Sequence, residues 1–314
     1  MSDAMPTRRP TTQPDERGEP MTTTGAEPKA EPGGEPLAII CGGGRFPGAV
    51  AAAVARRGRR PVMFGIKGWA DAAVIETYAH HWIAIGQAGR FFRLARAENC
   101  REVLFIGALL RPPIRQLRLD WRTIMLLPRV ISAFRGGDDR LLSGVAGVAE
   151  SGGLRVVGVK DVAPEVFMPE GALGRYRPSE RDTADIARAL SVISALSPFD
   201  VGQAAVVADN NVLAVEAAEG TDHMLARIAE LRRLGRVTAA PGVGVLVKAP
   251  KTGQDRRFDL PSIGPRTIEN VVLAGLAGIA VTAGSTMIAD ADDVIAAADR
   301  EKIFVIGVPE EARR

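Results

Sequence analysis

Blocks of apolar residues separated by polar turns run along most of the chain, and they predict strands that alternate with helices. Short apolar runs bounded by turn residues are typical of buried strands, and apolar positions spaced three or four apart are typical of helices. Strands that alternate with helices indicate a parallel sheet with right-handed crossovers. In the first part of the chain we predict strands at 37–41, 60–66, 80–86, 102–109 and 154–159, and helices at 48–57, 89–100, 121–134 and 141–150.

A second series of strands and helices follows, after a segment 161–178 that we expect to form loops. The pair Asn210–Asn211 tolerates positive φ and predicts a hairpin between strands 204–208 and 212–216. A helix at 182–196 precedes it and is expected to link two domains. The further elements that we predict are helices at 222–233, 268–277 and 292–298, and strands at 243–248, 278–282 and 302–308.

Composition supports this division. The chain has 314 residues, 46% of them hydrophobic, which is enough for two ordinary domains with buried cores. Residues 1–36 are rich in Pro, Thr, Glu and Gly, so we expect a disordered N-terminal extension with too little apolar surface to offset chain entropy. We therefore predict α/β domains over 37–178 and 200–314, joined by a linker helix within 179–199.

Charge and cysteine content limit the function classes. The net charge of +3 favours an anionic ligand only weakly, and no basic stripe interleaves with aromatic residues, so a nucleic-acid partner is not expected. Cys41 and Cys100 each lie in or beside an apolar segment and do not indicate a disulfide framework, which favours the cytoplasm. No apolar stretch is long enough to predict a membrane span.

A glycine-rich turn, Gly42–Gly44, follows the first predicted strand and precedes the first predicted helix. Such a turn can place backbone N–H groups around a phosphate at the positive end of the helix dipole. The spacing is not G-x-G-x-x-G, and no acidic residue ends the second strand, so a dinucleotide site is not favoured. The alternative is an ordinary tight turn between strand and helix.

The segment Glu219–Leu225 also carries candidate chemistry. We expect Thr221 to cap the following helix and Asp222 to lie in its first turn, which accounts structurally for both. Glu219 then remains as a candidate ligand or substrate contact. His223 is expected to lie on the helix surface, and His80 and His81 are expected to be structural.

The most unusual segment is 248–267, KAPKTGQDRRFDLPSIGPRT, which holds three Pro, two Gly, two Asp and five Lys or Arg. A solvated loop with local ion pairs is the ordinary interpretation of such a charge run. However, the prolines restrict the loop, and it leads into a predicted helix whose start lies near Thr267. Asp255 and Asp259 supply the hard oxygen ligands that Mg²⁺ or Mn²⁺ prefers beside substrate phosphates.

The segments CGGGRFPGAVA, GDDRLLSGVA, FDVGQAAVV, EGTDHML and KTGQDRRFDLPSIGPRT together resemble one family. It is the metal-dependent UDP-2,3-diacylglucosamine diphosphatase of lipid A synthesis, of the two-domain α/β type distinct from the calcineurin-like enzyme for the same step. The resemblance covers about residues 37 to 308. It implies a Rossmann-like N-terminal domain followed by a second α/β domain that is catalytic.

The resemblance implies hydrolysis to UMP and 2,3-diacylglucosamine 1-phosphate, with water attacking the β-phosphorus. The family's essential aspartate maps onto Asp255, within a pattern kept here as Gln254, Asp255, Arg257, Asp259 and Pro261. We expect Asp255, Arg257 and Asp259 to be catalytic, and Mg²⁺, or Mn²⁺, to be bound by Asp255 and Asp259 with Glu219 and Asp222. Substrate contacts are expected from Gly42, Gly43, Gly44, Asp138, Asp139, Gln203, Lys251, Gln254 and Thr267.

The same resemblance implies partners and leaves alternatives open. The substrate is a nucleotide-activated glycolipid, so we expect a cytoplasmic protein with transient contact to the inner-membrane surface, and a homodimer is an open hypothesis. The apolar stretch 124–134, edged by Arg122, Arg129 and Arg135, either rests on anionic lipid or is an ordinary core helix. The alternative functions are an NAD(P)-type oxidoreductase and a non-catalytic nucleotide or lipid carrier.

Overall fold

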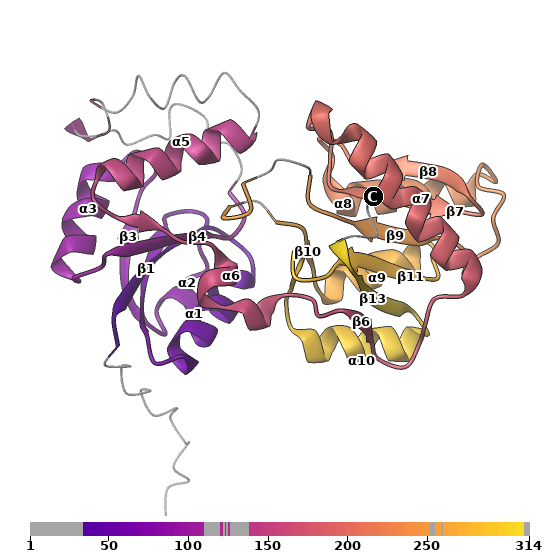
Figure 1. Cartoon of the computed structure of the whole chain (residues 1–314), viewed down its shortest axis with the longest axis horizontal. Coiled ribbons are helices and arrows are strands. Elements are labelled where there is room, and N and C mark those ends of the chain that lie inside the picture. Colours follow the sequence, from indigo (N-terminus) through magenta and orange to yellow (C-terminus); the bar gives the residue numbers. More distant parts are fainter. Residues whose placement is uncertain are drawn as a thin grey trace, which may run out of the picture. The chain divides into compact units, whose positions relative to one another are not determined.

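A five-stranded sheet and a six-stranded sheet organise the chain (Figure 1). The computed structural model describes residues 34–109, 120, 121, 123, 125, 138–251, 255–258 and 260–310, with the backbone alone over 138–143. These residues fall within one compact unit. The predicted α/β class, with a Rossmann-like N-terminal part followed by a second α/β part, is confirmed.

The first sheet is parallel throughout and has the strand order β3-β2-β1-β4-β5. This is the order of a Rossmann-type sheet, whose direction of winding changes between β1 and β4. Ile39 of β1 lies opposite both Met63 of β2 and Leu104 of β4. The strands are β1 (Pro36–Cys41), β2 (Arg60–Ile66), β3 (Ala79–Ile83), β4 (Glu102–Ile106) and β5 (Arg155–Val156).

Helices cover both faces of the first sheet, which explains why its strands read as nearly continuous apolar runs. Alternate residues of β1 lie in different cores: Leu37 and Ile39 pack with Val50 of α1, and Ala38 packs with Phe91 of α3. One face carries α1 (Phe46–Arg56), α2 (Ala72–Ile75) and α6 (Val159–Val162), and the other carries α3 (Ala88–Ala97) and α5 (Asp138–Ser151).

The second sheet has the order β6-β13-β11-β9-β7-β8. Its centre, β13-β11-β9, is parallel, and β7, β8 and β6 run antiparallel to their neighbours. The strands are β6 (Gly171–Leu173), β7 (Ala204–Ala208), β8 (Asn211–Val215), β9 (Val245–Lys248), β11 (Gly278–Thr282) and β13 (Phe304–Val308). A short parallel pair, β10 (Ser262–Ile263) with β12 (Met287–Ile288), was not predicted from the sequence.

The second sheet is also covered on both faces. Helix α7 (Glu180–Leu196) packs on one face through Ile186, Leu190 and Ile193. The other face carries α8 (Gly220–Arg233), α9 (Pro265–Leu273) and α10 (Ala291–Glu301). Short 3-10 turns at Pro164–Val166 and Ser197–Phe199 precede β6 and β7 respectively. Helix α7 therefore belongs to the second layered core rather than standing free.

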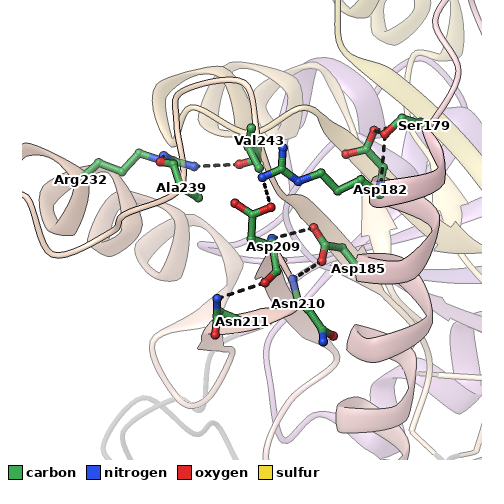
Figure 2. Close-up of polar contacts among 10 residues, drawn as sticks. Ser179, Asp182, Asp185, Asp209, Asn210, Asn211, Arg232, Ala239 and Val243 are labelled. Carbon is green, nitrogen blue, oxygen red and sulfur yellow. Dashed lines mark hydrogen bonds and ion pairs between the residues drawn. The ribbon is translucent and has the colours of Figure 1, made fainter.

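The hairpin between β7 and β8 is present, but its turn lies one residue earlier than predicted. Asp209 and Asn210 occupy the turn, both at positive φ, and Ala208 pairs with Asn211. The buried carboxylate of Asp185, on α7, accepts hydrogen bonds from the backbone N–H groups of Asp209 (3.1 Å) and Asn210 (2.6 Å) (Figure 2). The partner on α7 decides which residues form the turn, which local sequence does not reveal.

Several helices begin earlier than predicted, and two of these starts involve candidate site residues. Helix α8 begins at Gly220, so Thr221 is not its N-cap residue, although Asp222 does lie in its first turn. The Thr221 hydroxyl donates instead to Glu216 at 2.6 Å. Helix α5 begins at Asp138, three residues earlier than predicted. In both cases the helix extends further toward its N-terminus than the apolar periodicity indicated.

The predicted domain boundaries, with residues 1–36, 37–178, 179–199 and 200–314 as separate parts, stay predictions. In the structure, β6 pairs with β13 and α7 packs on β7 and β9, so both join the second sheet. Most of the predicted helix 121–134 lies outside the described residues. No helix in the described part of the chain is both long and apolar enough to span a membrane.

Candidate functional site

The ends of three strands lie side by side at one end of the second sheet, which we call its carboxyl edge because β9 ends there. Ala204 at the start of β7 lies opposite Lys248 at the end of β9, and Ala205 lies opposite Val215 at the end of β8. This topology places Gln203, Glu216 and Lys248 side by side, although up to 45 residues separate them in the chain. The loop that holds Asp255 leaves β9 from this same edge.

A pocket of about 460 Å³ opens at this edge. Its volume falls in the usual range for small-molecule sites. Gln203 and Lys251, two predicted substrate contacts, line it. The residues around the pocket are Asp200, Val201, Gly202, Gln203, Glu216, Ala217, Ala218, Gly220, Lys248, Lys251, Leu260 and Pro261.

The polar side chains of the pocket are held by specific contacts. Glu216 accepts hydrogen bonds from the backbone N–H of Gln203 (3.0 Å) and from the Thr221 hydroxyl, which ties the start of β7 to the start of α8. The buried Lys248 ammonium donates to the carbonyl oxygen of Ser262 at 2.9 Å, and Lys251 forms an ion pair with Asp200. The pocket thus holds two lysines and two carboxylates beside the N-terminus of α8, and the lysines are the groups that suit a phosphoryl oxygen.

Asp255 is held by the arginine two residues after it. The guanidinium of Arg257 grips both carboxylate oxygens, with Nη2–Oδ2 at 2.8 Å and Nε–Oδ1 at 3.0 Å, and the backbone N–H of Arg257 also donates to Oδ1. The hydrogen bond from the Arg257 side chain is the main cause that lowers the pKa of Asp255 below its ordinary value. Asp255 is therefore an ionised carboxylate at neutral pH, fixed in orientation by a bidentate pair.

Arg257 also contacts α5, which covers one face of the first sheet, and the neighbouring Phe258. Its Nη1 lies 3.4 Å from Oε1 of Glu150 on α5, and its guanidinium carbon lies 5.3 Å from the centre of the Phe258 ring. Phe258 in turn packs against Phe105 of β4, with ring centres 5.7 Å apart. The segment 255–258 is thus seated by charge and aromatic contacts on the part of the chain that precedes residue 166.

The other predicted metal ligands have different partners. Glu219 pairs with Arg227 at 2.9 Å, whereas Asp222 accepts a hydrogen bond from Asn270 at 2.8 Å and lies 3.3 Å from Arg266. Asp259 and Gln254 lie outside the described residues. Within the part of the chain that the structure describes, no three His, Cys, Asp or Glu side chains form a metal-binding group. The predicted four-carboxylate set stays a prediction.

The glycine-rich turn lies at the carboxyl end of β1, beside β4, where a sheet of this order offers a ligand crevice. The N–H of Gly42 donates to Ile106 and that of Gly43 donates to Ala108. A side chain at Gly42 would lie 2.5 Å from the Ala108 carbonyl oxygen, so glycine is required for the close approach of the two strands. These two N–H groups therefore hold the turn to β4 and are not available to a phosphate, whereas Gly44 lies exposed at φ +96°.

The structure describes the side chains of only some of the remaining predicted substrate contacts. Thr267 lies in the first turn of α9, where its hydroxyl accepts a hydrogen bond from the N–H of Gly264 at 3.1 Å. Asp138 and Asp139 form the first two residues of α5, and their side chains lie outside what the structure describes. Two pocket residues, Glu216 and Lys248, were missed in the sequence. Each stands at a strand end, which was a usable signal, but which ends meet depends on the strand order.

Comparison with known proteins covers both parts of the chain. Residues 36–166 match the family model described as the LpxI N-terminal domain, and residues 169–306 match that of the LpxI C-terminal domain. A UDP-2,3-diacylglucosamine pyrophosphatase LpxI of Caulobacter vibrioides is 41% identical over 277 residues, which is 88% of this chain and 99% of the relative.

Solved structures add no argument beyond this. The UDP-glucose-4-epimerase of Stenotrophomonas maltophila, with bound NAD and formylated UDP-arabinopyranose, is 19% identical at a TM-score of 0.26, over 39% of this chain and 36% of its own. The biotin carboxylase domain of the Hydrogenobacter thermophilus 2-oxoglutarate carboxylase is 12% identical at a TM-score of 0.24, over 71% and 44%. Structural similarity at these TM-scores is too low to support an assignment of function. The two family models and the curated relative show that the chain belongs to the LpxI family.

Proposed function

We propose that this protein hydrolyses the diphosphate of UDP-2,3-diacylglucosamine to UMP and 2,3-diacylglucosamine 1-phosphate, with water attacking the β-phosphorus. It is then an enzyme of lipid A synthesis of the type distinct from the calcineurin-like one. The observation that carries the proposal is the 41% identity to a pyrophosphatase of that name over 99% of its length. The pocket at the carboxyl edge of the second sheet supports it, because two lysines, Lys248 and Lys251, line it and can bind phosphoryl oxygens.

The chain's own residues have distinct roles in this proposal. Lys248 and Lys251 hold phosphoryl oxygens through charge-assisted hydrogen bonds and offset the negative charge that repels a nucleophile. Arg257 lowers the pKa of Asp255 and fixes its carboxylate through a bidentate pair, and the ionised carboxylate accepts a proton from water or binds a cation. Glu216 orients the pocket wall by joining β7 to α8.

We further propose that the reaction depends on Mg²⁺, with Mn²⁺ as a substitute. Mg²⁺ usually keeps several waters and binds through one or two carboxylates together with substrate phosphates. The ionised Asp255 fits that donor requirement, and Asp259 is the second carboxylate of the same loop. When bound, such an ion shields the charge of the diphosphate and stabilises the leaving phosphate.

The proposed substrate also bears on location. Its two acyl chains reside in a bilayer, so we propose a cytoplasmic enzyme that touches the inner-membrane surface, and a homodimer as its working form. Phe199 and Val201 support a lipid-facing role for the pocket rim, because both are exposed on either side of Asp200, which lines the pocket. The membrane-contact segment predicted at 124–134 lies almost wholly outside the described residues.

Release of UMP from UDP-2,3-diacylglucosamine tests the proposal. We expect turnover with Mg²⁺, a large loss with EDTA, and recovery when Mg²⁺ is added back. In water labelled with heavy oxygen, attack at the β-phosphorus places the label in the glycolipid phosphate, whereas label in UMP would contradict that step. Binding without UMP release would favour a carrier, and turnover in EDTA would contradict the metal requirement.

A further inference from the structure

The two arginines that follow Asp255 contact different parts of the molecule. Arg257 contacts Asp255 and reaches Glu150 on α5. Arg256 points to a different partner: its guanidinium pairs with the carboxylate of Glu310. The loop that bears Asp255 is therefore fixed on two sides by adjacent residues of the same charge.

The contact between Arg256 and Glu310 is bidentate. Arg256 Nη1 donates to Glu310 Oε2 at 2.9 Å, and Nη2 donates to Oε1. Nη1 also lies 3.4 Å from the hydroxyl of Ser285, a buried residue that follows β11. Glu310 follows β13, so both partners extend from the carboxyl ends of the central strands of the second sheet. A planar guanidinium held in this way fixes orientation as well as distance.

This pair contributes little to folding stability by itself. Its side chains are 47% and 43% exposed, and ion pairs at such positions are screened by solvent and salt. Its effect is local instead. Arg256 is the residue next to Asp255, and the N–H of Phe258 donates to the Asp255 carbonyl oxygen at 3.2 Å, so the segment is a tight turn. Holding one side chain of such a turn restricts the backbone on which the Asp255 carboxylate stands.

We propose that Glu310 is a positioning residue, which holds the 255–258 turn through Arg256 and so keeps the Asp255 carboxylate in place. The inference rests on the proposed hydrolase function. Glu310 lies beyond the range matched to the family's C-terminal domain, which ends at residue 306, and it belongs to no recognisable sequence motif. It differs from a substrate-binding role for Arg256, because both terminal nitrogens of that side chain already face Glu310.

The test uses the full chain with Glu310→Gln, Arg256→Gln, the double variant, and Glu230→Gln as a matched control. Glu230 also pairs bidentately with an exposed arginine, Arg233, on α8. We expect kcat for UMP release to fall about tenfold in Glu310→Gln, since small misplacements of catalytic groups have large effects. KM and the melting temperature are expected to stay near the wild-type values. The double variant should be no worse than Arg256→Gln.

Hydrogen exchange of the peptide spanning 255–258 gives a readout that does not require turnover. Exchange should rise in Glu310→Gln and stay at the wild-type level in Glu230→Gln. High salt should lower the kcat of the wild type and leave that of Glu310→Gln nearly unchanged, because the screened pair is already absent. Glu310→Asp should recover part of the lost kcat.

Three results would overturn the inference: wild-type kcat in Glu310→Gln, additive losses in the double variant, or unchanged exchange over 255–258. The last decides the matter even for an inactive protein. A wild type that does not release UMP would instead refute the proposed function, while exchange alone would still decide whether Glu310 holds the turn. The two failures are therefore distinguishable.

Discussion

Replacing Asp255 by asparagine separates catalysis from folding. The change keeps the size of the side chain and removes the charge that Arg257 grips with contacts of 2.8 to 3.2 Å. The two side chains are 25% and 40% exposed, so the pair contributes about 0.2–1 kcal/mol to stability. A loss of about 1 kcal/mol lowers the melting temperature of a domain of about 150–250 residues by about 2–4 °C. We therefore expect the melting temperature of the variant to fall by about 4 °C at most.

The expected effect on catalysis is much larger. Proton transfer by a positioned side chain typically contributes about a hundredfold to ten-thousandfold to the rate, or about 2.7–5.4 kcal/mol. We therefore expect Asp255→Asn to lose nearly all UMP release while its melting temperature changes by a few degrees at most. Glu150→Gln, which removes the other partner of Arg257, is the control and should keep most activity.

The pH profile checks the same carboxylate. Arg257 lowers the pKa of Asp255, so the carboxylate is ionised throughout the neutral and mildly acidic range. A lowered pKa stabilises the fold above the unfolded-state pKa, and this contribution is lost as the pH falls through the folded-state value. On acidification we therefore expect no loss of activity through protonation of Asp255 until the pH falls below the pKa range of ordinary aspartates. Near-normal kcat in Asp255→Asn, or a melting temperature as low as that of a core variant, would refute this reasoning.

Two further predictions concern the fold. Asp185→Asn leaves one acceptor oxygen for the two turn N–H groups that the buried carboxylate serves, so we expect a loss of about 1.5–3 kcal/mol and a lower melting temperature. The control Arg181→Gln breaks only an exposed ion pair to Asp209, and equal small shifts in both variants would contradict the argument. Burial raises the pKa of Cys41 to about 12 and that of Cys100 to about 11, so neither thiol should react with an alkylating reagent in the native protein at neutral pH. Both should react in denaturant, and rapid native labelling would show that the fold opens locally.

Local patterns predicted most elements correctly because both sheets are buried on both faces. An apolar run such as Leu37–Cys41 has few stable alternatives to a central strand, and the first sheet's strands were all located. The short strands β10 and β12 were missed because neither contains an apolar run. Each has two residues, and each is a strand only because it pairs with the other. The turn at Asp209–Asn210 was displaced for a similar reason, since Asp185 lies 24 residues away from it in the chain.

The candidate site was also predicted only in part from the sequence. The unusual charge and proline content of 248–267 marked the loop, and the residue types marked Asp255, Arg257 and Lys251 as candidates. The partners of these residues were not predicted. Neither Glu150 beside Arg257, nor Glu310 beside Arg256, nor the meeting of Glu216 with Lys248 at one edge follows from local spacing.

The sequence by itself determined the α/β class, the division into two layered parts and the loop that carries the candidate chemistry, because burial patterns and residue types are local properties. The tertiary structure alone decided which charges meet. Strand order brings Gln203, Glu216 and Lys248 to one pocket, and the course of the loop commits Arg257 to Asp255 and Arg256 to Glu310. Electrostatic contacts act over a few ångströms in space, whatever the distance along the chain, so their pairing depends on the fold.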